Sequence, residues 1–151
     1  MSDISDIEIN QLPAVAAIAA GDVLPLDQAD ATRGLSIAQL DARYASTATI
    51  AFAWGDASPK QLLTVPAGRR VLTVRLIVDT AFDGAGAALA VGDAGDPGRL
   101  LAAAENDPGT PGTYAAHPAV LYGADTALTL TITPGAGASQ GAGAVIVTTD
   151  P

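Results

Sequence analysis

The chain has 151 residues, the size of one domain with room for an appended arm. Its 16 Asp and Glu residues against 7 Lys and Arg give a net charge of −9, which argues against binding to nucleic acid or to an anionic membrane surface, because both need clustered cations. The chain has no cysteine and one histidine, which excludes disulfides, thiolate catalysis, cysteine-ligated metals and a multi-histidine metal centre within one chain.

The apolar residues are mostly small. The sequence holds 33 Ala, while Val, Ile, Leu and Phe together number 36. Alanine buries little apolar surface, and burial contributes about 25 cal/mol per Å². We therefore expect a folded domain of modest stability that gains from association with other chains, and no cofactor.

Residues 1–45 read as an N-terminal docking arm. They carry seven acidic and two basic residues, and their apolar residues stand in short runs. Pro13 and Pro25 remove backbone donors and favour extended neighbours. The acidic start does not resemble a secretory signal, and the apolar stretch 14–20 is too short to cross a bilayer. The arm should be unable to form a core and should lie on a partner.

The end of the arm carries a helix signal. Ser36 and Gln39 have the spacing of a capping box, and apolar side chains then recur at helical spacing. The pattern predicts a short helix at about 36–45. The residues expected to dock on the partner are Ile9, Leu12, Pro13, Val23, Leu24, Leu26, Arg33, Ile37, Leu40 and Tyr44.

Residues 46–151 change to a period of two, which indicates strands with one buried face. The clearest stretch has Leu72, Val74, Leu76 and Val78 on its apolar side, and a second alternates apolar residues with threonine over 128–133. Further strands are expected at Ile50–Trp54, Gln61–Val65, Ala87–Val91, Ala119–Tyr122 and Ala144–Thr149.

Turn signals separate these strands, for example Pro66-Ala67-Gly68 and Asp107-Pro108-Gly109. The pattern lacks the crossover helices that a parallel sheet requires. The fold class is therefore mainly β: an antiparallel β-sandwich or jelly-roll body at 46–151, preceded by an extended arm with a short helix.

Few residues point to chemistry. The glycine runs beginning at Gly84 and Gly135 lack the order of the dinucleotide and phosphate-binding motifs and fit loops. His117 precedes Pro118 without a nucleophile motif and fits a surface loop. Several acidic residues fall in the predicted loops of the body: Asp79, Asp83, Asp93, Asp96, Glu105 and Asp107. A calcium site built from them is one interpretation, and solvated turn acids are the more ordinary one.

The aromatic residues are scarce enough to be noticed. Phe52 and Trp54 are two residues apart and should share one strand face. Together with Tyr114 and Tyr122, they are candidates for interface anchors or ligand contacts, more often the former.

Three stretches of the arm resemble the N-terminal segment of tailed-bacteriophage virion proteins. They are Ile9–Ala14 (INQLPA), Gly21–Leu26 (GDVLPL) and Thr32–Leu40 (TRGLSIAQL). The body motifs Phe52–Pro59, Val65–Val71 and Gly137–Gly141 are similar to small β-domains of the same proteins. The motifs are typical of phage structural proteins and say little about position on the virion.

This resemblance implies a non-enzymatic virion protein assembled in the host cytoplasm. The first hypothesis is a capsid decoration protein, a cement protein or short head fibre, which docks on the major capsid protein or another virion protein and projects a homotrimeric β body. The alternative is a small tail or tail-tip fibre protein whose body binds a host surface glycan. A soluble carbohydrate-active enzyme is the third, least favoured class. The chain is short compared with typical tail fibres, which favours a location on the phage head.

Overall fold

The computed structural model describes residues 23–28, 31–36 and 45–150. The backbone divides into two compact units, Met1–Arg43 and Tyr44–Pro151. In the first unit the strands β1 (Val23–Gln28) and β2 (Ala31–Ser36) pair antiparallel. The predicted helix at 36–45 lies outside the described residues except for its ends: Ser36 closes β2, and Ala45 precedes the next strand.

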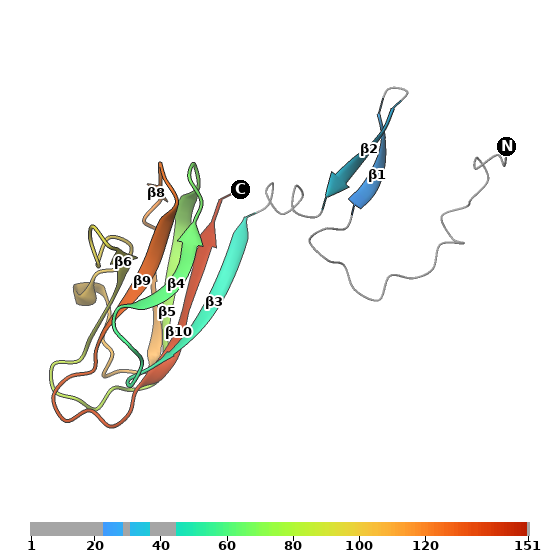
Figure 1. The fold of residues 1–151 in the computed structure, drawn as a ribbon. Helices are drawn as coiled ribbons and strands as arrows, with labels where there is room; N and C mark the ends of the chain where they lie inside the picture. The colour runs from blue at the N-terminus through green and yellow to red at the C-terminus, as the bar shows by residue number, and fades with distance from the viewer. Residues whose placement is uncertain (1–22, 29–30, 37–44, 151) are drawn as a thin grey trace, which may run out of the picture. The chain divides into compact units, whose positions relative to one another are not determined.

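The second unit is built from two antiparallel sheets, drawn as two layers in Figure 1. One sheet has the order β3-β10-β5-β7, with β8 also paired to β5, and the other has the order β4-β9-β6. The prediction of a mainly β, antiparallel sandwich is therefore confirmed. The strands are β3 (Ser46–Ala53), β4 (Lys60–Val65), β5 (Arg70–Thr80), β6 (Ala88–Asp93), β7 (Gly112–Ala116), β8 (Val120–Leu121), β9 (Thr126–Thr133) and β10 (Ala142–Thr149).

The core lies between the sheets and follows the period of two. Along β10, the buried side chains Val145 and Val147 alternate with half-buried ones, and β9 contributes Leu128, Leu130 and Ile132 from the facing sheet. Alternate residues of a strand point to the same face. The positions that face the core are mostly occupied by valine, leucine and isoleucine.

One position of the predicted pattern in β5 is wrong. Leu72 is 37% exposed, while Val71 is fully buried. The pairing of β5 with β10 shifts between Thr148 and Thr149, so that Thr148 pairs with Thr73 and Thr149 with Val71. Leu72 is the extra residue of this bulge, and a bulge moves the side chains that precede it to the other face of the strand.

Two elements were not expected from the sequence. Strand β7 forms on residues 112–116, and the short 3-10 helix η2 (Ala103–Glu105) follows β6. Within the described residues, no helix is long and apolar enough to cross a membrane.

Candidate interaction site

The described part of the arm is a two-stranded ribbon. Val23, Leu24 and Leu26 lie in β1, and Arg33 lies in β2 opposite Leu26. The sequence predicted extended backbone here but not this pairing. Among the described residues no third strand joins the ribbon, and an isolated two-stranded ribbon is marginally stable in water. The remaining predicted docking residues lie outside the described residues: Ile9, Leu12, Pro13, Ile37, Leu40 and Tyr44.

Phe52 and Trp54 do not share a strand face as predicted. Phe52 is 3% exposed and stacks on Phe82, with ring centroids 6.3 Å apart. Strand β3 ends at Ala53, and Trp54 begins the turn that follows with its side chain 40% exposed. Of this pair, only Trp54 is accessible to a partner.

The two tyrosines are held by hydrogen bonds within the body. The hydroxyl of Tyr114 donates to the carbonyl oxygens of Asp107 and Thr110, at 2.8 and 2.9 Å. The hydroxyl of Tyr122, a buried residue, donates to Oδ2 of Asp93 at 3.0 Å. Both tyrosines therefore fasten loops of the sandwich.

Asp93 is the one buried carboxylate among the described residues. Its Oδ1 accepts the backbone N–H groups of Gly95 and Asp96 at 2.8 and 3.1 Å. Its Oδ2 lies 2.7 Å from Nε of Arg99 and also accepts the Tyr122 hydroxyl. From the sequence, a turn acid was the more ordinary interpretation of Asp93, but Asp93 ends β6 after two buried residues and is itself buried.

The electrostatics of this cluster favour a charged aspartate and a neutral tyrosine. Burial alone would raise the pKa of Asp93, but the donors from Gly95, Tyr122 and Asp96, with the charge of Arg99, hold it below the ordinary value of 3.8. Burial, and then the bond to Asp93, raise the pKa of Tyr122 well above its ordinary value of 10. With its oxygens occupied by four donors, the carboxylate braces the loop at 93–99.

The other loop acids mostly act as turn acids. Asp83 accepts bonds from the backbone N–H and hydroxyl of Ser139, which lower its pKa. Asp107 accepts from Gly109 and Thr110, and Glu105 from the backbone of Ala102. No group of three or more potential metal-ligating side chains assembles within the described residues, so their geometry lends the calcium alternative no support.

His117 follows β7, and its side chain is exposed. Its Nδ1 lies 3.3 Å from the hydroxyl of Thr73 on the neighbouring strand. This is an exposed contact between two polar side chains.

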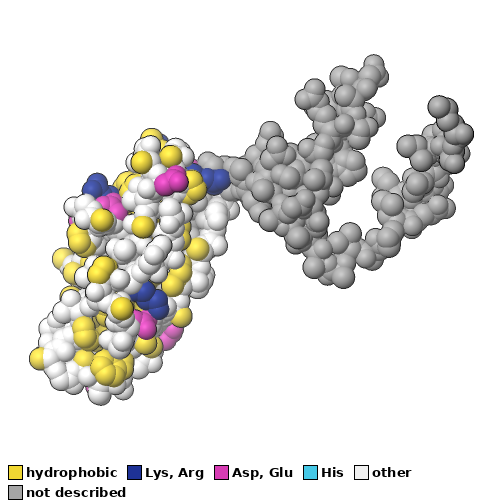
Figure 2. Space-filling view, in the orientation of Figure 1, with side chains coloured by type: hydrophobic (Ala, Val, Ile, Leu, Met, Phe, Trp, Pro, Cys, Tyr) yellow, Lys and Arg dark blue, Asp and Glu magenta, His cyan; other side chains and the backbone are white. Residues whose placement is uncertain are grey.

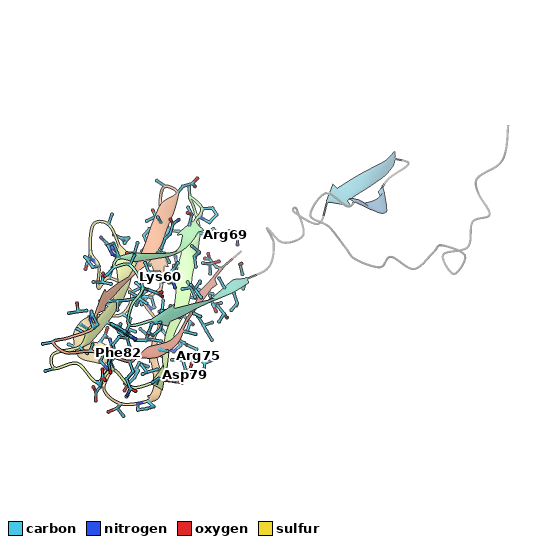
Figure 3. The ribbon with its side chains drawn as sticks, turned by 60° about the horizontal axis from the view of Figure 1, so that its bottom comes forward. Lys60, Arg69, Arg75, Asp79 and Phe82 are labelled. Atoms are coloured by element: carbon cyan, nitrogen blue, oxygen red, sulfur yellow. The ribbon has the colours of Figure 1, made fainter. Side chains whose placement is uncertain are left out.

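The outer face of the five-stranded sheet is a regular surface of the body. The strand pairings place Thr49, Ile146, Arg75 and Ala115 in one row across it, and Ala51, Ala144, Ile77 and Thr113 in the next. These residues alternate with the buried ones, so they face away from the core. The face combines alanine and threonine with the larger side chains of Ile146, Ile77 and Arg75, of which Arg75 is labelled in Figure 3.

Charged side chains are few and dispersed over the visible face of the body. Figure 2 shows Lys or Arg beside Asp or Glu in several small groups, with hydrophobic side chains scattered between them. An ion pair of the body joins Lys60 and Asp56, whose Nζ and Oδ2 lie 2.6 Å apart. The arrangement suits packing contacts between surfaces better than recognition of a polyanion.

Comparisons with known proteins give two structural likenesses. A chain from the acid-stable capsid structure of Helicobacter pylori bacteriophage KHP30 superposes with a TM-score of 0.56 and 14% identity, covering 70% of this chain and 86% of that one. A chain from the capsid asymmetric unit of cyanophage Pam1 superposes with a TM-score of 0.52 and 23% identity, covering 98% of this chain and 100% of that one. No family model and no curated protein matches the sequence. The two likenesses establish a shared fold.

Proposed function

We propose that the chain is a non-enzymatic structural protein of a bacteriophage virion, located on the capsid. The observation that carries the proposal is the likeness to a capsid chain of cyanophage Pam1, because it spans 98% of this chain and the whole of the other. The likeness to a chain of the KHP30 capsid supports the same proposal. The arm motifs of tailed-phage virion proteins agree with both.

Within this role, we propose a decoration protein of the cement or short head-fibre type. Residues 1–45 dock on the major capsid protein or another virion protein, and the body at 46–151 projects from the shell. The incomplete β1–β2 ribbon supports docking, since a two-stranded ribbon gains stability from a packing partner. The saturated bonds of Asp93 support a role without catalysis. Binding to nucleic acid or membrane is not part of the role.

The resemblance to phage fibre and decoration proteins also suggests a homotrimer. Closed cyclic symmetry is the common form of such assemblies. A body rich in alanine buries little area per subunit, so association would add to its stability. The outer face of the five-stranded sheet offers a surface for this purpose.

The docking role is tested with full-length variants and capsids assembled without the chain. We expect the double variant Leu24→Asp and Leu26→Asp to lose co-sedimentation with the capsids, because the charges oppose burial of β1 against a partner. The matched control is Leu121→Asp, at a leucine of the body that is 58% exposed, and it should bind as the wild type does. Equal binding by all three proteins would contradict docking through the arm.

The second candidate is a small tail or tail-tip fibre protein whose body binds a host surface glycan. Its specific support is Trp54, an indole 40% exposed at the end of β3, since exposed aromatic rings serve as sugar platforms. Loss of glycan-array binding in Trp54→Ala would favour this role, whereas no binding by the wild type would leave the capsid role standing.

A further inference from the structure

Among the described strands, β3 forms an open edge of the five-stranded sheet. It lies at one end of the order β3-β10-β5-β7, and its eight residues (STATIAFA) contain neither a charge nor a proline. Its pairing with β10 runs from Ser46–Thr149 to Ala53–Ala142 without a register shift. Proteins usually protect such edges with charges, prolines, bulges or very short strands, and β3 has none of these protections.

The other edges of the sandwich are protected. In β4 the pairing shifts between Gln61 and Leu63, and Lys60 begins the strand. The edge of β6 is covered where Val91 exchanges backbone hydrogen bonds with Leu101. Strand β7 has five residues and lies between Pro111 and Pro118. Among the described strands of the sandwich, β3 is thus the exception.

The outward backbone groups of β3 can be identified from the alternation of an antiparallel pair. The N–H of Trp54 donates to the carbonyl of Gly141 at 2.8 Å, so even-numbered residues of β3 bond to β10 and odd-numbered residues point their N–H and C=O outward. Ala53 agrees with this assignment, because its outward N–H and C=O are both taken by Asp56, at 3.0 Å each. Within the described part of the chain, the outward groups left without a partner are those of Thr47, Thr49 and Ala51.

We propose that this edge pairs with β3 of a second copy of the chain, antiparallel and centred on Thr49. The outward groups are symmetric about Thr49, so Thr49 meets the same residue of the partner, and Thr47 meets the partner's Ala51. A two-fold contact places like residues together, and a charge near its centre would repel itself. The absence of charge from the strand satisfies this requirement.

The contact goes beyond the proposed function and does not depend on it. It is isologous and closes at two copies, so on a capsid it would link two neighbouring assemblies pairwise, apart from any three-fold contact within them. An edge of this length is small beside the roughly 1,200–2,000 Å² of a stable interface. We therefore expect a two-fold association, of single chains or of two trimers, whose population depends on protein concentration.

The absence of cysteine from the chain makes the contact testable by cross-linking in the full-length protein. Hydrogen-bonded antiparallel partners have Cα atoms about 5.5 Å apart, a separation that suits a disulfide. Under mild oxidation with copper phenanthroline, Thr49→Cys should form a covalent dimer about tenfold faster than Thr64→Cys, an exposed threonine on β4. Equal rates for the two variants would overturn the proposal.

The register is tested by two further variants. Thr47→Cys and Ala51→Cys should each stay monomeric on oxidation, because like positions then lie too far apart, whereas a mixture of the two should form the cross-linked pair. Rapid dimerisation of Thr47→Cys alone would overturn the register.

Sedimentation velocity tests the contact itself. Thr49→Lys should abolish the concentration-dependent two-fold association, while Thr64→Lys should keep it. If the wild type and Thr49→Lys have the same mass at every concentration, the proposed contact is wrong.

Discussion

The hydroxyl of Tyr122 donates to the carboxylate of Asp93 at 3.0 Å and thereby joins the two sheets of the sandwich. Asp93 is the last residue of β6 in one sheet, and Tyr122 follows β8, which belongs to the other. Arg99 and the N–H groups of Gly95 and Asp96 complete the shell around the carboxylate. The loop at 93–99 is consequently fixed to both sheets by one side chain.

Replacing this carboxylate should destabilise the body. Asp93→Asn removes the charge and leaves donors without an acceptor, which should lower the free energy of unfolding by about 2 kcal/mol. The ion pair with Arg99 should contribute little to this loss, because the Arg99 side chain is 42% exposed. Tyr122→Phe should cost about 1 kcal/mol. Urea denaturation measures both, with Asp79→Asn, an exposed residue of β5, as the control near zero.

If Asp93→Asn and Asp79→Asn unfold at the same urea concentration, the buried carboxylate does not contribute to the stability of the body. A double-mutant cycle of Asp93→Asn with Tyr122→Phe should show coupling, because the two side chains share a hydrogen bond.

The same cluster predicts how stability depends on pH. The pKa of Asp93 is lower in the folded protein than its ordinary 3.8, so its contribution is complete above that value and is lost as the pH falls through the folded pKa. The difference in unfolding free energy between the wild type and Asp93→Asn should therefore shrink from neutral pH to about pH 2. Denaturation series at several pH values measure it, and a difference that grows on acidification would contradict the assignment.

Close packing around Gly143 gives a second prediction about stability. A Cβ at this position of β10 would overlap the carbonyl oxygen of Ile77 and the ring of Phe52. Gly143→Ala should cost about 2–3 kcal/mol, since neither neighbour can yield without moving the sheet. Gly55→Ala, where a Cβ meets nothing within 4 Å, is the matched control and should change stability by less than about 0.5 kcal/mol.

The sequence predicted the strands that alternate strictly and missed those that do not. In β9 and β10 every second residue is buried, so periodicity located them. Strand β7 (GTYAA) has only Tyr114 as a large side chain, too little for a visible pattern. Leu72 was assigned to the wrong face because a bulge depends on the partner strand, which a local pattern does not contain.

The candidate site was less accessible to sequence reasoning than the fold. The burial of Asp93 depends on Tyr122 and Arg99, which reach it from other parts of the chain. Trp54 was expected to share a face with Phe52, but β3 ends between them. The pairing of β1 with β2 follows from residues whose prolines and polar neighbours give no alternation. Of these contacts, the one between Asp93 and Tyr122 joins segments far apart in the chain, which a local pattern does not contain.

The arm should contribute to attachment and not to the stability of the body. Within the part of the chain whose burial is described, the core residues lie between Phe52 and Val147. Removal of residues 1–45 should therefore change the unfolding free energy of the body by less than about 1 kcal/mol while abolishing attachment to capsids. Calorimetry and co-sedimentation measure the two effects. A shortened chain that no longer folds, or that still binds capsids, would contradict the division of roles.

Salt should weaken attachment of the full-length chain. The arm carries seven acidic and two basic residues, so a partner surface with basic patches is expected, and exposed charges are screened within about 10 Å at 0.1 M ionic strength. Co-sedimentation should decrease as sodium chloride is raised. Attachment that is unchanged or strengthened by salt would indicate apolar docking instead.

The copy number of the chain in purified virions tests the central claim most directly. Quantitative mass spectrometry against the major capsid protein gives this number. A capsid decoration protein follows the symmetry of the shell, so we predict on the order of hundreds of copies per particle. A handful of copies would place the chain on the tail, and its absence from purified virions would contradict a structural role in the particle.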